Sequence, residues 1–429
     1  MKFAVSTLGC KVNQYETSAL SSMLTERGHV KTDGEAADVL IINTCTVTGE
    51  SSRKSRQAIR RMHQQNSDAL LVVCGCFSQI SPQEVRQMGA DIVYGSGDKT
   101  KLADDIEKAF TDRQQVMHIP ESRARREFEK LPAAPGLGRT RAMLKIEDGC
   151  DNFCTYCIIP HARGPVRSLP PEDAVSQAVR LSQNGYSELV ITGIEIASYG
   201  RDIQYEKGLA GLAAAVSEAA PDMRIRLGSL EPNAVSDEFC GTLKNINLCN
   251  HFHLSLQSGS DTVLKRMGRR YDTDTFYSAV LRLRRHFPDC GITCDLITGF
   301  PGETLSEHEE TLEFIRKCRF SSMHIFPYSP RPGTPAAAMD GQIDKSEKSR
   351  RAREAQQAGR EMEMQFLCSC IGKTLPVLFE TEKDGSCCGH GDNYALVSVR
   401  AENLSGVMRN VKISGVCGRM LYGTVSEIL

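Results

Sequence analysis

Three cysteines lie close together in the run Glu-Asp-Gly-Cys-Asp-Asn-Phe-Cys-Thr-Tyr-Cys, at Cys150, Cys154 and Cys157. Their spacing is Cys-x3-Cys-x2-Cys, and thiolates are the ligands that hold iron–sulfur clusters. Three thiolates can bind three irons of a four-iron cluster, which leaves the fourth iron open to a substrate or cofactor. A structural metal site would usually be closed by four protein ligands. The spacing therefore predicts a cluster with one open iron.

This spacing resembles the signature of the radical S-adenosylmethionine (SAM) superfamily, in which the open iron binds SAM and reduces it to a carbon radical. A disulfide framework is the first alternative, but it is typical of small secreted domains. This chain has 429 residues and an odd count of 17 cysteines, and too few residues precede Cys10 for a signal peptide. A zinc site is the second alternative. The nearby His161 follows Ile-Ile-Pro, and we expect it to be structural.

The bulk composition is that of a globular protein. A chain of 429 residues predicts two or three domains, and no apolar stretch is long enough to cross a bilayer, so we expect a cytoplasmic protein without a membrane partner. The net charge of −1 means that any basic surface for nucleic acid must be local. The absence of Trp and the aromatic content of 6% argue against aromatic stacking as the main mode of binding.

The first hundred residues alternate strand and helix patterns, which predicts an open, mostly parallel α/β sheet. Cys10, Cys45 and Cys76 each follow the carboxyl end of one of its first three strands, and that edge is where sites form in such sheets. We therefore expect a second trio of thiolates there, the alternative being three unrelated buried cysteines. Cys74 lies inside a strand pattern and is expected in the core. The predicted strands are Phe3–Leu8, Asp38–Ile42, Ala69–Val73 and Asp91–Tyr94, and the predicted helices are Asn13–Arg27, Ser51–Gln65 and Pro82–Met88.

The rest of the chain divides into a linker and two further domains. Residues 113–138 mix charges with Pro and Gly, which predicts a solvated linker between a domain at 1–112 and the next at 139–368. Six strand–helix units in the latter predict a partial parallel (β/α)6 barrel. Residues 369–429, after a charged helix at Lys345–Glu363, predict a small all-β barrel. The predicted strands are Ala142–Ile146, Leu189–Thr192, Ile225–Leu230, Phe252–Leu256, Ile292–Thr298 and Met323–Pro327, then Leu375–Glu380, Ala395–Arg400, Val411–Val416 and Leu421–Ile428.

Glycines and polar residues follow several strands of the predicted barrel, on the side of the Cys150 loop. Glycine lets the backbone approach a ligand closely, and polar groups can bind a ribose or an amino acid, so together they predict a SAM pocket. The cofactor-binding candidates are Thr192, Gly193, Gln257, Ser258, Asp295, Gly299, Gly302 and Glu303.

Two basic runs are candidates for RNA phosphate contacts. The helix after Cys45 has five basic residues between positions 51 and 67 and no acidic one. A second run lies in the barrel, whereas the terminal β-barrel carries as many acids as bases. The basic residues of the two runs are Arg53, Lys54, Arg56, Arg60 and Arg61, and Arg266, Arg269 and Arg270.

The whole chain resembles the radical-SAM methylthiotransferases. The stretch Leu-Gly-Cys-Lys-Val-Asn-Gln-Tyr-Glu, the stretch Asn-Thr-Cys-Thr and the stretch Gly-Cys-Phe-Ser-Gln are similar to that family's three auxiliary-cluster motifs. The resemblance implies that Cys10, Cys45 and Cys76 hold the auxiliary cluster, and that the Cys150 trio holds the SAM cluster. It also implies that the C-terminal barrel is a TRAM domain, an RNA-binding module.

Asn-Thr-Cys-Thr-Val-Thr, the basic helix and Cys-Ile-Ile-Pro-His-Ala-Arg-Gly resemble the MtaB type within this family. The resemblance implies methylthiolation of C2 of N6-threonylcarbamoyladenosine at position 37 of ANN-decoding tRNA. The near relatives act on isopentenyladenosine or on an aspartate of ribosomal protein S12. Two four-iron clusters, SAM as methyl donor and radical source, the tRNA anticodon stem-loop and a flavodoxin- or ferredoxin-type electron donor are implied. A non-enzymatic iron–sulfur carrier is the alternative, but it would need no SAM pocket.

Overall fold

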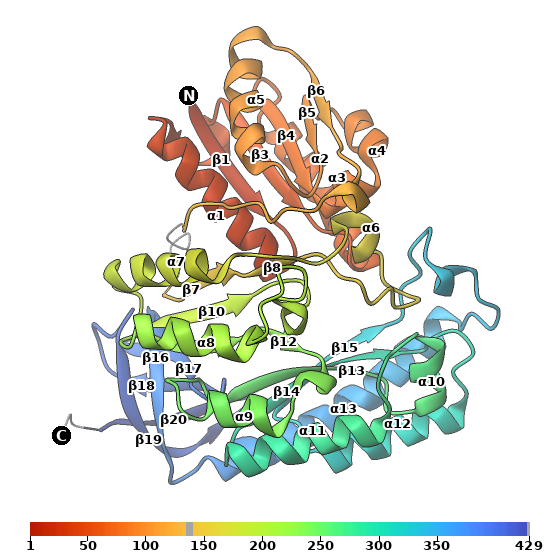
Figure 1. Cartoon of the computed structure of the whole chain (residues 1–429), viewed down its shortest axis with the longest axis vertical. Coiled ribbons are helices and arrows are strands. Elements are labelled where there is room, and N and C mark those ends of the chain that lie inside the picture. The colour runs from red at the N-terminus through yellow and green to blue at the C-terminus, as the bar shows by residue number, and fades with distance from the viewer. Residues whose placement is uncertain (134–139, 427–429) are drawn as a thin grey trace.

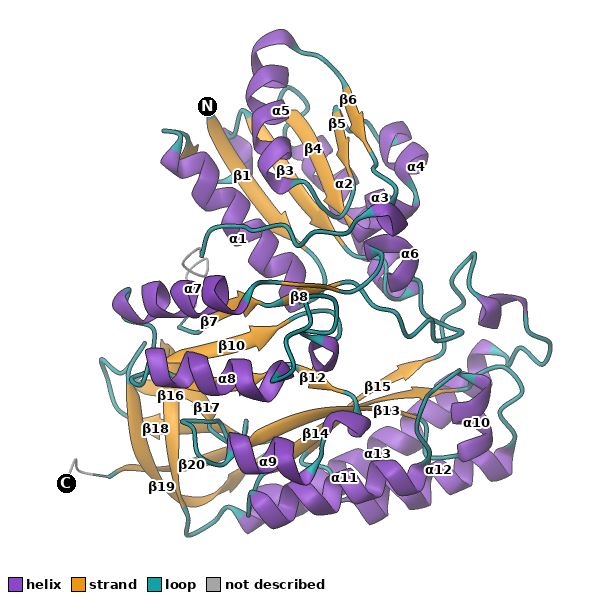
Figure 2. Cartoon of the chain, viewed as in Figure 1, coloured by secondary structure: helices purple, strands orange, loops and turns teal. Residues whose placement is uncertain are grey.

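The computed structural model describes residues 1–133 and 140–426. An α/β sheet at the N-terminus stands above a partial barrel, and a small β-barrel flanks the partial barrel on the side away from its strand ends (Figures 1 and 2). No helix in these residues combines the length and the apolar character needed to span a membrane. The predicted fold class is confirmed in all three parts.

The N-terminal sheet has six parallel strands in the order β2-β1-β3-β4-β5-β6. β3 and β4 are buried on both faces, as expected of parallel strands covered by helices, and their sequences are almost entirely apolar. Helices α1 and α5 pack on one face, and α2, α3 and α4 pack on the other. The bounds are β1 Lys2–Thr7, β2 Val30–Lys31, β3 Val39–Thr44, β4 Leu70–Gly75, β5 Ile92–Tyr94, β6 Val116–His118, α1 Lys11–Glu26, α2 Gly49–Gln65, α3 Cys76–Ile80, α4 Pro82–Gln87 and α5 Lys99–Asp112.

The predicted linker is not irregular throughout. Its residues 116–118 form β6, which pairs with β5 and is the edge strand of the N-terminal sheet, and residues 122–124 form the 3-10 helix η2 (Ser122–Ala124). A strand of three half-exposed residues carries too short a pattern to stand out among charges. Residues 134–139, with the predicted end of the linker, lie outside the described residues.

The central barrel has six strand positions, as predicted. They form the parallel sheets β11-β10-β7 and β12-β13-β14-β15, because the third predicted strand is divided at Gly228, whose N–H donates to the Ile191 carbonyl. The bounds are β7 Ala142–Lys145, β8 Glu147–Asp148, β9 Arg167–Ser168, β10 Glu188–Thr192, β11 Arg224–Leu227, β12 Ser229–Leu230, β13 His251–Gln257, β14 Gly291–Thr298, β15 Ser322–Pro327, α6 Ile159–Arg163, α7 Pro171–Gln183, α8 Gly208–Ala219, α9 Asp237–Leu243, α10 Asp261–Arg266, α11 Thr273–His286, α12 Leu305–Cys318 and α13 Lys345–Ser369.

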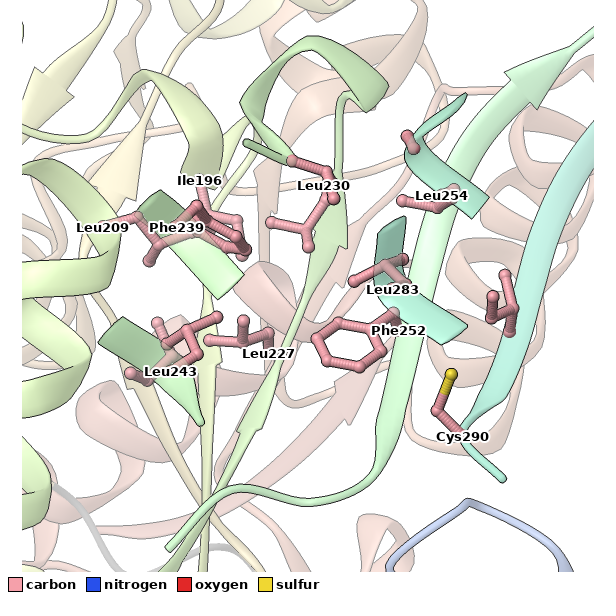
Figure 3. Packing of buried hydrophobic residues seen from close by; sticks show 14 of the residues in the cluster. Ile196, Leu209, Leu227, Leu230, Phe239, Leu243, Phe252, Leu254, Leu283 and Cys290 are labelled. Carbon is pink, nitrogen blue, oxygen red and sulfur yellow. The ribbon is translucent and has the colours of Figure 1, made fainter. Parts of the chain in front are cut away.

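Apolar side chains fix the helices against the barrel strands. Phe252 of β13 and Leu227 of β11 face Leu243 of α9 and Leu283 of α11, and all four are fully buried (Figure 3). Each such side chain contributes about 1.5–3 kcal/mol to folding. This core holds the strand ends, and hence the loops that follow them, in fixed positions.

The C-terminal barrel is closed and has five strands in the order β16-β17-β18-β20-β19. The sequence predicted four. It missed β17, whose sequence Ser-Cys-Cys-Gly-His-Gly has no β-branched or large aromatic residue. The last predicted strand is β20, and its predicted residues 427 and 428 lie outside the described ones. The bounds are β16 Thr374–Lys383, β17 Ser386–Gly391, β18 Leu396–Arg400, β19 Met408–Cys417 and β20 Met420–Val425.

Buried charges join this barrel to the central one. Arg224 and Arg226 of β11 both bond the Glu188 carboxylate of β10 and donate to backbone carbonyls of the C-terminal barrel, among them those of Pro376 and Gly391. Glu188 is fully buried, and the two guanidinium groups lower its pKa to about 2.

The pH dependence of stability tests this junction. Because the folded pKa of Glu188 lies below its unfolded value of about 4.3, its ionisation stabilises the folded state above about pH 5 and ceases to do so as pH falls towards 2. We expect Glu188→Gln to lose about 3 kcal/mol at pH 7, and we expect the difference from wild type to shrink between pH 5 and pH 3. Urea unfolding at several pH values measures this difference. A difference that stays constant over that range would contradict the assignment.

Candidate functional site

The N-terminal trio lies at one edge of the N-terminal sheet. Cys10 precedes α1, Cys45 follows β3 and Cys76 begins α3, and β1, β3 and β4 are neighbours in the sheet. Gly9 has φ +106°, and a Cβ there would lie 2.8 Å from the Cys45 sulfur, so only glycine fits beside this thiol. The structure therefore brings together the three cysteines that the strand ends predicted.

These thiols are held in a mostly buried setting. Cys45 and Cys76 are buried and Cys10 is exposed. Burial raises the pKa of Cys45, and it raises that of Cys76 to about 12, with the neighbouring sulfurs of the trio adding to both shifts. Thiolates at this place need a cation, and a coordinated metal supplies one. Cys74 packs in the sheet core, as predicted.

The second trio lies on the loop that follows β8. Cys154 is buried, and Cys150 and Cys157 are half-buried. Burial raises the pKa of Cys157 to about 12, and that of Cys150 is raised also. Arg269 Nη1 donates to Cys154 Sγ at 3.1 Å. The loop is fixed to the barrel by backbone bonds, including one from Thr155 N–H to the Met267 carbonyl.

Two of the predicted phosphate contacts are used inside the protein instead. Arg269 has a side chain only 5% exposed and forms a double hydrogen bond with the Glu231 carboxylate. Arg266 is paired with Glu307. Arg270 is exposed. In the basic helix α2, Arg53 pairs with Glu50 and Arg56 with Glu84, so part of that charge is neutralised too.

A buried arginine connects the N-terminal trio to the start of the second cysteine loop. Arg163, at the end of α6, has no exposed surface, and its Nε donates to Cys76 Sγ at 3.4 Å. Its Nη1 donates to Glu16 of α1 at 2.7 Å and to Asp148, next to the second cysteine loop, at 2.9 Å. Lys145 of β7 bonds the same two carboxylates, both at 2.8 Å. One ionic network therefore joins the N-terminal cysteine site to Asp148, which lies two residues before Cys150.

The predicted cofactor pocket is only partly assembled as expected. Thr192, Gly193 and Gly299 follow strand ends or close them, but Asp295 lies within β14 and faces His253 and His324. The Glu303 carboxylate accepts from the N–H groups of Gly299 and Phe300.

The other candidates also have bonds or close contacts within the chain. The Gly302 N–H donates to the Gly341 carbonyl, and Ser258 is buried beside Thr311. Gln257 has φ +65° at the end of β13. Several of these residues therefore shape the turns around the pocket rather than offer free groups to a ligand.

A cavity of about 350 Å³ opens at the carboxyl ends of the first barrel strands. None of the eight predicted cofactor-binding residues lines it, and its lining instead includes Asn152, Glu195, Glu231 and Arg270. Glu195 and Glu231 lie just after the strands β10 and β12, as the predicted glycines lie after their strands. Their position after a strand end could have identified them in the sequence. Burial raises the pKa of Glu195.

Within the described residues, no three His, Cys, Asp or Glu side chains converge to hold a single metal ion. A four-iron cluster does not need such convergence. Each thiolate binds a different iron, so the three sulfurs stand further apart than the ligands of a single metal ion do. Each trio has one arginine N–H group on one of its sulfurs, which stabilises negative charge there. Both sets of residues therefore fit an iron–sulfur cluster.

Comparisons with known proteins agree with this geometry. Residues 144–315 match the Radical SAM superfamily, and residues 2–95 match Uncharacterized protein family UPF0004. The chain is 40% identical over 422 residues to the threonylcarbamoyladenosine tRNA methylthiotransferase MtaB of Bacillus subtilis, covering 96% of this chain and 93% of that protein. The chain belongs to the radical-SAM tRNA methylthiotransferase family. Members of this family use SAM and 4Fe–4S clusters.

The chain is also similar to a methylthiotransferase with another printed substrate and, in fold, to a solved radical SAM structure. It is 31% identical to the tRNA-2-methylthio-N(6)-dimethylallyladenosine synthase of Alkaliphilus oremlandii, over 88% of this chain and 82% of that protein. Among solved structures, the radical SAM methyltransferase TsrM from Kitasatospora setae has a TM-score of 0.57, with 14% identity over 90% of this chain and 80% of that one. At that identity the likeness shows the fold alone.

Proposed function

We propose that the protein transfers a methylthio group to C2 of N6-threonylcarbamoyladenosine at position 37 of tRNA. The observation that carries this proposal is the pair of cysteine trios, with Arg163 bonded to Cys76 of the first and to Asp148, two residues before the second. Relatives named for this nucleoside are 35–40% identical to the chain, whereas relatives named for dimethylallyladenosine are 30–32% identical. Isopentenyladenosine-37 and an aspartate of ribosomal protein S12 are the alternative targets.

We assign one cluster to each trio. Cys150, Cys154 and Cys157 hold the cluster that binds SAM, and Cys10, Cys45 and Cys76 hold the auxiliary cluster. When bound, these groups supply a carbon radical and sulfur, because the C2–H bond is unactivated and side-chain acids and bases cannot remove its hydrogen. Residues 1–112, 139–368 and 369–429 then carry the auxiliary cluster, the SAM cluster and an RNA-binding barrel.

The protein's own residues position these two sites. Arg163 and Glu16 have no exposed surface, so their charges attract each other more strongly than they would in water. Arg269 is held by Glu231 and keeps one N–H group on Cys154. The target base must be unpaired to reach a buried site, which favours a nucleotide of the anticodon loop. A flavodoxin- or ferredoxin-type protein in the cytoplasm supplies the electrons.

Nucleoside analysis tests the proposal. A strain that lacks this gene should lose 2-methylthio-N6-threonylcarbamoyladenosine from its tRNA and accumulate the form without the methylthio group, as measured by mass spectrometry. A plasmid copy should restore the modified nucleoside. If this nucleoside is unchanged while the methylthio derivative of isopentenyladenosine is lost, or ribosomal protein S12 loses mass, the substrate assignment is wrong.

A further inference from the structure

The loop that carries the second cysteine trio presents an aromatic ring that the core does not use. Phe153 lies between Cys150 and Cys154, is 51% exposed and has φ +47°. A bulky residue in the left-handed region costs about 1–3 kcal/mol and is unusual outside functional sites. The fold therefore keeps an apolar ring in solvent, beside the cluster loop, at a cost in stability.

Two neighbours complete a stacking platform around this ring. The Arg123 guanidinium carbon lies 5.6 Å from the centre of the Phe153 ring, and the His161 ring meets it nearly edge-on, with centroids 6.3 Å apart. Arg123 belongs to η2, which packs against α6, and His161 belongs to α6. Aromatic rings and guanidinium planes are the groups on which proteins stack unpaired nucleobases.

The platform lies in a cavity of about 520 Å³ that also contains Arg125 and Arg126. Among the described residues, none of its three arginines has a carboxylate within 4 Å, and Arg123 and Arg126 are exposed. The two aspartates of the cavity are already bonded: Asp151 accepts from a backbone N–H, and Asp202 accepts from a backbone N–H and a hydroxyl. These bonds come from neutral groups, so the aspartates stay charged, but three arginines face two aspartates and the cavity is net positive.

This cavity is separate from the one at the barrel mouth. The two share no residue, although both border the cluster loop, the first through Asn152 and the second through Asp151 and Phe153. The cavity at the barrel mouth opens at the carboxyl ends of the first barrel strands, the edge at which such barrels build their active sites. The arginine-lined cavity is therefore available to a different ligand that is bound beside the same loop.

We propose that Phe153 and Arg123 bind an unpaired nucleobase of the substrate RNA, next to the base that reacts, with Arg126 on a neighbouring phosphate. This inference rests on the proposed function, since it takes the substrate to be RNA. A base stacks on the ring beside the Arg123 guanidinium, and a phosphate meets the exposed Arg126 guanidinium, so the platform matches a nucleotide better than a peptide side chain. The platform adds an aromatic contact to the RNA-binding groups predicted from the sequence. Part of the charge of those basic residues is neutralised by carboxylates within the protein.

Binding of a labelled tRNA anticodon stem-loop to the reconstituted enzyme tests this inference. We expect Phe153→Leu to weaken binding about tenfold, as removal of one stacked base contact does, and Phe153→Tyr, which keeps the ring, to bind within about twofold of wild type. Arg123→Gln lies outside the cluster loop. It should weaken binding, because it removes the guanidinium beside the stacked base. Arg285→Gln, an exposed arginine paired with Asp237, is the matched control and should bind as wild type.

The outcomes separate this inference from the proposed function. If wild type binds and modifies the RNA while Phe153→Leu and Arg123→Gln bind it equally well, the platform is wrong and the function stands. If wild type binds no RNA, both are wrong. Measured iron content shows whether a Phe153 variant has lost its cluster. If it has, the RNA binding of Arg123→Gln alone decides whether the platform exists. Equal loss of binding in Phe153→Leu and Phe153→Tyr would also overturn the stacking contact.

Discussion

Replacing Cys154 with alanine should abolish the formation of 5′-deoxyadenosine from SAM, while the iron at the N-terminal trio is retained. Two thiolates are left where three are needed, and no side chain can replace a cofactor radical, so we expect a loss of at least about 10³-fold. Iron per chain should fall by about half after anaerobic reconstitution, since one of the two clusters is lost. Chromatography of the reaction products and an iron assay measure both effects.

The matched variant Cys45→Ala should lose the cluster of the N-terminal trio and keep that of the second. Its second trio is intact, so it should still cleave SAM, but it should make no methylthiolated RNA. A third variant, Cys318→Ala, removes a buried cysteine that lies in the barrel core and in neither trio, and it should keep wild-type iron. If Cys45→Ala and Cys154→Ala lose the same activities, the division into two clusters is wrong.

The N-terminal trio could be predicted because its cysteines follow strand ends, whereas the second trio was predicted from its spacing in the sequence. Parallel strands in this chain are continuous apolar runs, such as Val-Leu-Ile-Ile in β3, and their carboxyl ends fall at one edge whatever the rest of the fold does. Cys45 and Cys76 follow such runs directly. The barrel strands were found for the same reason, whereas β6 and β17 are too short or too polar to give this signal.

The ionic network could not be predicted, because its members are far apart in sequence. Glu16 and Arg163 are separated by 147 residues, and each occurs in a stretch that a single sequence gives no reason to bury. Charged residues are usually exposed, so Arg269 was assigned to phosphate binding when it is in fact held by Glu231. Which charges become buried depends on how the N-terminal sheet packs against the barrel, and sequence patterns contain no information on that packing.

The effect of neutralising Glu16 is the sharpest test of how the two halves are joined. Its carboxylate is fully buried and accepts hydrogen bonds from Lys145 and Arg163, which hold its pKa at about 2. Glu16→Gln keeps the shape of the side chain but leaves these cations with one carboxylate, that of Asp148, to share. We expect a loss of about 3–5 kcal/mol in the free energy of unfolding, since a buried pair has lost one partner.

Urea unfolding followed by circular dichroism measures this loss, and a control lies on the same helix. Glu26→Gln changes an exposed carboxylate at the end of α1 and should alter the free energy of unfolding by less than about 0.5 kcal/mol. The double variant Glu16→Gln with Lys145→Met removes one charge of each sign, so it should be more stable than Glu16→Gln alone. If the second substitution only adds to the loss, Lys145 and Glu16 do not stabilise one another, and the packing of α1 on β7 must then depend on its apolar contacts.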